Sequence, residues 1–362
     1  VFLVARVYPI FSAYDGNALF VVAIVGLITA LLASTIALVS VDLKRILAYS
    51  TISHLGLMML ALGAGGYTAA IFHLLAHGFA KALLFLGAGS VMHGTDELDI
   101  RKMGGLRKAM PMTAFLFSLG ALSLGGIPIL SGFWSKDEIL LAVNEHLTPA
   151  FIILALWTAF LSAMYMARAM FVPFFGNLGQ DMDHAHESPM SMIVPMALLG
   201  ILAAFFGFAA LDWPGSYEGI GSFIFFHEAE GFHFSWWLGI VSIVLAVGAF
   251  VLGYLVYLKG SVSLEGFRSK TGGLLLVVES KYYFDEVYQW MVDHVVLLLA
   301  RFIGMFDRVV VNDLAVNGPA NSLRRLGIVM RLHVTGHVYS YALGMVVGTI
   351  ALSLFWWLKS VS

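Results

Sequence analysis

Residues 125–138 have the sequence GGIPILSGFWSKDE, and they lie inside an apolar run that extends over 112–146. This run is much longer than the ~20 residues that a straight helix needs to cross a bilayer. Pro128 removes a backbone donor and the neighbouring glycines free the chain, so we predict that the helix breaks at 125–132 into two half-helices. A break at membrane depth is tolerated where protein or a wet cavity satisfies the freed backbone groups, and such breaks often lie at ion sites.

The composition indicates that the rest of the chain also lies in a membrane. Hydrophobic residues make up 60% of the chain and charged residues only 12%, whereas a soluble domain carries about 25% charged residues. The sequence therefore predicts an all-α polytopic membrane protein, built as a helical bundle with one broken transmembrane helix. The apolar runs long enough to span lie near 16–40, 46–64, 67–93, 112–146, 149–175, 190–211, 236–258 and 339–359, and residues 1–10 have the character of the tail of a preceding transmembrane helix.

The stretch 281–335 differs from these runs because charged residues are spread along it. Apolar residues such as Trp290, Leu298 and Phe302 recur between the charges at spacings of three and four, which is typical of an amphipathic helix. We predict a long lateral helix that lies along the cytoplasmic face before the last span, bent or interrupted at Gly318-Pro319.

Loop charge predicts the orientation. Alternation of the spans places the loops 41–45, 94–110, 176–189 and 259–280 on one side. All of them except the acidic 176–189 loop carry Lys or Arg, and the positive-inside rule makes that side cytoplasmic. The chain starts within an apolar run without Met, so we expect it to be a piece of a longer protein. A net charge of -2 argues against a nucleic-acid partner, and the absence of cysteine excludes disulfides and cysteine-ligated iron–sulfur clusters. The basic residues on the predicted cytoplasmic side are Lys44, Arg45, Arg101, Lys102, Arg107, Lys108, Lys259, Arg268 and Lys270.

Three basic residues share one face of the predicted span 67–93. His73, His77 and Lys81 follow at intervals of four, so they line one stripe of the helix. Imidazole titrates near neutral pH and passes protons through its two ring nitrogens. The stripe therefore favours a proton path over three separate core residues. A His-x3-His pair also suits a metal, but this span lacks the carboxylate that such a site usually adds.

Lys136 opens the second half-helix and is followed by Asp137 and Glu138. Ionisable residues in spans usually face the bundle interior and mark ion paths. A lysine between desolvation and nearby carboxylates can load and release a proton, which makes these three residues candidates for proton transfer. The alternative is that Lys136 is an interfacial anchor paired with one of the two carboxylates.

Other candidates are weaker. Lys44 and Arg45 precede the span 46–64 and fit cytoplasmic flanking residues, although Lys44 also fits a proton path. His54 lies deeper in that span among hydroxyl-bearing neighbours, which predicts a water-lined point where protons enter. His93 lies near the cytoplasmic end of its span, with function and packing equally open. The loop cluster Asp181, Asp183, His184, His186 and Glu187 is interpreted as solvated rather than metal-binding.

Three stretches together resemble the proton-antiporter module shared by complex I and Mrp-type antiporters. They are residues 41–56, VDLKRILAYSTISHLG, residues 73–86, HLLAHGFAKALLFL, and the stretch 125–138. Residues 335–342, TGHVYSYA, and the amphipathic helix further resemble the subunit L or subunit 5 family of NADH–quinone oxidoreductase. The resemblance extends over essentially the whole chain and corresponds to the C-terminal portion of that subunit.

The resemblance implies a division of the chain into parts. Residues 1–10 end a preceding helix, 16–175 form the second five-helix antiporter repeat, and 190–258 add two transmembrane helices. The stretch 281–335 is the lateral helix along neighbouring antiporter-like subunits, and 339–359 is the final span. The residues that match the family's proton path are His73, His77, Lys81 and the exit residue Lys136; the position of His54 departs from the pattern.

The resemblance also implies the function. The chain is expected to move protons in a multi-pass cell inner (plasma) membrane, as a subunit of the H⁺-translocating enzyme NADH:quinone oxidoreductase. No redox site is expected in this chain, and NADH, FMN, iron–sulfur clusters and quinone would bind partner subunits. The alternatives are a large subunit of an Mrp-type sodium/proton antiporter or of a membrane-bound hydrogenase, and a passive assembly strap whose buried basic residues serve packing only.

Overall fold

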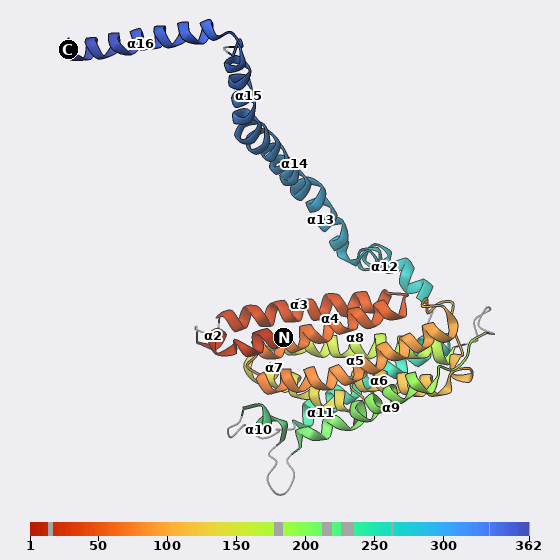
Figure 1. The fold of residues 1–362 in the computed structure, drawn as a ribbon. Helices are drawn as coiled ribbons and strands as arrows, with labels where there is room; N and C mark the ends of the chain where they lie inside the picture. The colour runs from red at the N-terminus through yellow and green to blue at the C-terminus, as the bar shows by residue number, and fades with distance from the viewer. Residues whose placement is uncertain are drawn as a thin grey trace. The chain divides into compact units, whose positions relative to one another are not determined.

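The structure is a computed structural model, and it divides into two units that are described separately (Figure 1). Unit 1 comprises Val1–Tyr282 and unit 2 comprises Tyr283–Ser362. No strand is present in the described part of the chain, where Asp42 and Asp99 form an isolated β-bridge. The described residues are 1–13, 17–176, 184–211, 219–225, 235–261, 264–332 and 334–361.

Unit 1 is a helical bundle in which the long helices run side by side (Figure 1). The described residues of the chain contain seven helices long and apolar enough to cross a membrane, six of them in unit 1. Residues 1–10 fall in two five-residue helices that meet at Val7. The helices of unit 1 are α1 (Phe2–Arg6), α2 (Tyr8–Ser12), α3 (Asn17–Val39), α4 (Leu43–Gly63), α5 (Tyr67–Thr95), α6 (Pro111–Gly125), α7 (Ser131–His146), α8 (Pro149–Met170), α9 (Met190–Phe205), α10 (Gly219–Phe225), α11 (Trp236–Gly253) and α12 (Leu264–Glu279).

The helix break predicted at residues 125–132 is present between α6 and α7. Gly126 ends α6 with a φ of +83°, a left-handed conformation that favours glycine. At Gly132 the two half-helices approach so closely that a Cβ would lie 1.9 Å from the Ser123 carbonyl oxygen. The Ser123 hydroxyl accepts from the Gly132 nitrogen at 3.3 Å, and Ser123 and Ser131 both donate to the Ala203 carbonyl of α9, at 3.0 and 2.6 Å. The break is thus stabilised by a neighbouring helix.

Glycines also set the distance between α3 and α4. A Cβ on Gly56 would lie 2.6 Å from the Ala30 nitrogen, and a Cβ on Gly26 would lie 2.5 Å from the Leu60 nitrogen. Small residues at helix interfaces let backbones approach closely in a membrane, where dispersion contacts rather than the hydrophobic effect hold helices together. This contact fixes α4, which carries His54, against the outer helix α3.

Unit 2 contains the predicted amphipathic helix and the last span. Lys281, Tyr282 and Tyr283 have left-handed φ values of 51°, 57° and 57°, so the helix begins at Phe284 rather than at 281. It then continues to Arg331 as α13 (Phe284–Met291), α14 (Leu297–Phe306) and α15 (Gly318–Arg331), joined by π-helical stretches at Val292–Val296 and Asp307–Asn317. The last helix, α16, covers Val338–Val361.

The chain remains helical through Gly318 and Pro319. An interruption there was one of the two outcomes expected from the sequence, and it is wrong: Gly318 has φ -59° and ψ -60°. Pro319 lies in the first turn of α15, where a missing N–H and a fixed φ are compatible with a helix. The π-helical stretch before it changes the hydrogen-bond register, which lets the helix pass a residue that would otherwise end it.

The close contact of α3 and α4 generates a stability prediction. Gly56→Ala forces the two backbones apart, and overpacking of this kind costs about 1–3 kcal/mol. The matched control is Gly78→Ala on α5, where an added Cβ meets nothing within 4 Å. We expect Gly56→Ala to lower the thermal midpoint in detergent and Gly78→Ala to leave it unchanged or raise it. Equal midpoints for the two variants would contradict the close contact.

Candidate functional site

The three basic residues predicted to share a face of α5 all point into unit 1. His73 is 0% exposed, His77 is 4% exposed and Lys81 is 6% exposed. The one-face prediction is therefore confirmed by burial. The surrounding helices supply the polar groups that these side chains contact.

A hydrogen-bonded chain connects three helices through His73. His54 Nδ1 on α4 lies 2.9 Å from His73 Nε2, and His73 Nδ1 lies 2.8 Å from the Ser135 hydroxyl on α7. The ring of His77 lies 5.1 Å from that of His54 and 6.0 Å from that of His73, centroid to centroid. His54 is thus part of the cluster, and His73 connects it to Ser135, the residue that precedes Lys136.

The hydrogen bonds favour one arrangement of protons in this chain. Ser135 lies 3.1 Å from the Ser131 carbonyl, to which its hydroxyl donates. His73 Nδ1–H then donates to Ser135, which leaves His73 Nε2 as the acceptor of a proton from His54 Nδ1. In that arrangement His54 Nε2 carries a lone pair, and this atom is buried without a hydrogen-bond partner. It is a proton acceptor at one end of the chain.

The two buried lysines occupy similar polar sockets. Lys81 Nζ donates to the Leu47 carbonyl and to the Ser50 hydroxyl, both at 2.8 Å. Lys136 Nζ donates to the Leu124 carbonyl at 2.6 Å and to the Ser162 hydroxyl at 2.7 Å. Each socket provides two acceptors, which matches the two N–H groups of a neutral amine, whereas an ammonium has three. The sockets therefore accept a lysine that changes its charge.

Lys136 does not pair with the carboxylates that follow it. In the described part of the chain no carboxylate oxygen lies within 4.0 Å of its Nζ, so the pairing with Asp137 or Glu138 that the alternative interpretation required is absent. Successive residues of a helix point about 100° apart, which directs Asp137 elsewhere. Its Oδ1 accepts a 3.4 Å hydrogen bond from Ser242 on α11. Glu138 is half-buried.

Lys44 lies apart from the cluster, because its Nζ contacts the Met92 sulfur at 3.1 Å near the start of α4. The loop cluster is only partly described, since Asp181 and Asp183 lie outside the described residues. Within the described residues, no group of three or more His, Asp or Glu side chains has an arrangement suited to a metal.

The sequence interpretation was that Glu187 is solvated, but its carboxylate forms hydrogen bonds within the protein. Its carboxylate accepts from the Met112 nitrogen at 2.8 Å and from the Thr113 hydroxyl at 2.6 Å. These bonds cap the N-terminus of α6, whose first N–H groups have no partner within the helix. Nearby, His184 Nε2 lies 3.2 Å from the Thr95 carbonyl, and the His93 and His186 rings meet edge-on at 5.6 Å.

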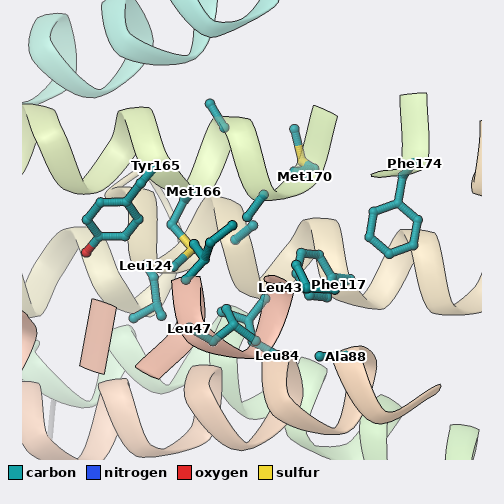
Figure 2. Packing of buried hydrophobic residues seen from close by; sticks show 14 of the residues in the cluster. Leu43, Leu47, Leu84, Ala88, Phe117, Leu124, Tyr165, Met166, Met170 and Phe174 are labelled. Carbon is teal, nitrogen blue, oxygen red and sulfur yellow. The ribbon is translucent and has the colours of Figure 1, made fainter. Parts of the chain in front are cut away.

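Sequence reasoning noted the hydroxyl-bearing neighbours of His54 but missed the contacts that serines make with the buried basic groups. Ser50, Ser135 and Ser162 bind these groups, yet serine is common in spans and gives no periodic signal. Tyr165, three residues after Ser162 on α8, is also fully buried, and its hydroxyl has no hydrogen-bond partner. In Figure 2 this hydroxyl points away from the apolar cluster that surrounds the ring.

Comparison with known proteins identifies a family that part of the chain matches. Residues 1–162 match the family described as NADH:quinone oxidoreductase/Mrp antiporter, TM. Residues 1–162 are therefore similar to the transmembrane module of that family. The module includes α3 to α7 and most of α8, so every member of the His–Lys cluster lies within it.

Similar proteins extend beyond the antiporter module. The chain is 37% identical to NAD(P)H-quinone oxidoreductase chain 5 of Picosynechococcus sp. over 97% of its length, and 36% identical to NADH-quinone oxidoreductase subunit L of Rickettsia bellii over 100%. It is 34% identical to NADH-ubiquinone oxidoreductase chain 5 of Arabidopsis thaliana over 100%. The chain spans 57–58% of the length of these relatives. The expected resemblance to the subunit L or 5 family is confirmed.

Burial of the two lysines generates a labelling prediction. In folded protein in mild detergent, a water-soluble amine-acetylating reagent should modify exposed Lys108 and spare Lys81 and Lys136. After denaturation all three lysines should react, which controls for sequence effects on labelling. Peptide mass spectrometry reports the extent at each lysine. Modification of Lys136 in the folded protein as fast as Lys108 would contradict the buried socket.

Proposed function

We propose that this chain translocates protons as part of the membrane domain of a respiratory NADH–quinone oxidoreductase, through its buried histidines and lysines. One observation carries the proposal: two lysines lie buried in sockets without a carboxylate, and a histidine chain runs between α4 and α7 beside them. A charged side chain at this depth is costly to keep. In an antiporter module this cost serves function, because a buried lysine that loses its proton easily can pass it on.

The proposed path includes the hydrogen-bonded chain of His54, His73 and Ser135 and the buried basic residues around it. Protons enter at the start of α4, where Lys44 lies, and reach Lys81. They then pass through His77, His54 and His73 to Ser135 and Lys136, with Asp137 and Glu138 beyond it. His77 has a buried, unpartnered Nε2, so its ring can accept a proton and turn toward either neighbour.

Electrostatics gives the path a direction. Like charges repel strongly where the effective dielectric constant is low, so a proton on one member of the cluster disfavours a second proton on its neighbours. Lys136 contacts Leu124, whose carbonyl belongs to the last turn of α6. A helix C-terminus carries partial negative charge and stabilises a cation by typically 0.3–1 kcal/mol. We therefore propose that arriving charge collects at Lys136 before release to the outer side.

Coupling to redox chemistry would come from partner subunits. We propose that they bind NADH, FMN, iron–sulfur clusters and quinone, and that this chain contributes no redox cofactor. Within unit 2 the apolar residues of the amphipathic helix, such as Trp290, Leu298 and Phe302, are exposed. That uncovered apolar surface supports docking against neighbouring antiporter-like subunits and the cytoplasmic face of the lipid bilayer, in the cell inner membrane.

The second candidate is a large subunit of an Mrp-type sodium/proton antiporter, since the matched family includes both. A subunit of a membrane-bound hydrogenase, the other alternative from the sequence resemblance, is the third candidate. Sodium-dependent transport by the native complex, or a complex purified without NADH-oxidising subunits, would favour these alternative candidates. Pumping that requires NADH oxidation and does not depend on sodium favours the NADH–quinone oxidoreductase.

Replacement of Lys136 tests the proposed path. Lys136→Ala in the chain's native complex should abolish proton pumping in membrane vesicles, while electron transfer from NADH falls less. The lysine is the collecting site, and alanine can neither accept a proton nor fill the socket. The control is Lys108→Ala on the exposed loop, which should pump normally. Pumping and electron transfer are measured together, by the quenching of a pH-sensitive dye and by NADH oxidation.

The same assay separates the passive assembly strap. If the basic residues serve packing only, complexes that assemble with His77→Ala or Lys81→Ala should pump at the rate of the unmodified complex. The proposed path instead requires lower pumping at equal assembly, measured by the amount of intact complex on a native gel. Full pumping by Lys136→Ala would overturn the proposal itself.

A further inference from the structure

A small cavity lies between Lys136 and α11, on the opposite side of α7 from the histidines' serine contact. Its walls include Gly126, Lys136, Ala159, Ser242 and Ala246. The space open to the centre of a water-sized sphere is about 10 Å³, which is about what one water needs. Two polar groups, the Lys136 amine and the Ser242 hydroxyl, face a mostly apolar lining.

Ser242 connects this cavity to Asp137. Its hydroxyl donates to Asp137 Oδ1 at 3.4 Å, and Asp137 is 3% exposed. Asp137 follows Lys136 in sequence but does not contact its amine. The cavity and the Ser242 hydroxyl therefore lie between the Lys136 amine and the Asp137 carboxylate, which do not contact each other. The hydroxyl of Ser242 belongs to α11, outside the matched residues 1–162.

We propose that Ser242 is a proton-relay residue that carries protons from Lys136 to Asp137 through one water in this cavity. The inference rests on the proposed function, because it extends the same path beyond Lys136. A charged Lys136 has three N–H groups, and the two acceptors of its socket pair with two of them. The water accepts a hydrogen bond from the third. A neutral Lys136 lacks that third donor, so the connection forms when the lysine is loaded.

The transfer conserves protons and charge. The N–H bond of the Lys136 ammonium breaks, and its proton passes to the water. The water gives a proton to Ser242 Oγ as the original hydroxyl proton of Ser242 passes to Asp137 Oδ1. Lys136 ends as a neutral amine, Asp137 as a neutral carboxylic acid, and water and serine are unchanged. Asp137 then releases its proton outward, and the Ser242 hydroxyl rotates back.

A direct contact between the Lys136 amine and the Asp137 carboxylate would be less suitable for proton transfer than this cavity. A lysine paired with a carboxylate in a low-dielectric interior holds its proton tightly, because both charges are stabilised together. One water and one hydroxyl keep the charges apart and still allow the proton to cross. Gly126 helps to leave this space open: a Cβ there would lie 3.7 Å from Lys136 Nζ.

Three serine substitutions test the relay in the native complex. Ser242→Ala removes the hydroxyl and should lower proton pumping per NADH at least about tenfold, since a positioned proton transfer is worth about 10²–10⁴. Ser242→Thr keeps a hydroxyl and should restore most pumping. The matched control is Ser118→Ala on α6, where the hydroxyl donates to the Ala114 carbonyl of its own helix at 2.6 Å; it should pump normally.

A cavity-filling variant tests the water independently of the serine. Ala246→Leu adds side-chain volume to the wall and should lower pumping with the Ser242 hydroxyl still present, while Ala210→Leu, also buried but outside the cavity, should not. The solvent deuterium isotope effect on pumping should increase in Ser242→Ala, which a packing defect would not cause. Assembly of each variant is compared on native gels before rates are compared.

The outcomes separate the two proposals. If Lys136→Ala abolishes pumping and Ser242→Ala pumps normally, the relay through Ser242 is wrong and the path through Lys136 stands. If Lys136→Ala pumps normally, both are wrong. Loss in Ser242→Ala without rescue by Ser242→Thr, or with an unchanged isotope effect, would also overturn the relay, because the serine would then serve packing alone.

Discussion

The amine of Lys136 is held by the carbonyl of Leu124, and this contact depends on the break in the helix. An α-helix uses all but its last four carbonyls in its own ladder. Because α6 ends at Gly125, the Leu124 carbonyl has no partner within the helix and remains available. The turn through Gly126 then brings α7 back so that Lys136, one and a half turns into it, reaches that carbonyl at 2.6 Å. An unbroken helix would have neither the free acceptor nor this return.

The rest of the cluster follows from the same requirement, which is to bury an amine without a permanent counter-charge. Lys81 uses a mid-helix carbonyl, that of Leu47, which also accepts from Thr51. This acceptor is shared, whereas the Leu124 carbonyl lies at a helix C-terminus. The two sockets have the same chemistry but different strength for a cation. A relay needs such a difference, since a lysine in an ion pair would keep its proton and a lysine without acceptors would never be charged.

Residue types and their period predict much of the fold. The spans follow from apolar length, the break from Gly and Pro, and the stripe of His73, His77 and Lys81 from a spacing of four. The partner of Lys136 does not follow, because adjacent carboxylates in a sequence point in other directions on a helix. Glu187 and Ser135 were also missed as contacts, since each acts on a helix far away along the chain. Contacts of this kind depend on which helices pack together, and one sequence does not determine that.

The continuation of the amphipathic helix through Pro319 has a similar cause. Proline is unfavourable in a helix interior but is compatible with the first turn of a helix, where Pro319 lies in α15. A change to π-helical bonding before Gly318 places the proline where no donor is required. Pro319 correctly indicated an irregularity in the helix, but the backbone changes its hydrogen-bond register before this residue and the helix does not end.

The helices outside the matched module complete the site. Ala203 of α9 supplies the carbonyl that binds Ser123 and Ser131 across the break, and α11 supplies Ser242 beside Lys136. Without α9, two serine hydroxyls at a tightly closed break would lose their acceptor in an apolar environment, where an unmet hydrogen bond is costly. Without α11, the cavity beside Lys136 would open to lipid. The stability of the break within the module therefore depends on helices that follow it, and the chemistry of Lys136 belongs to the packed unit rather than to the repeat alone.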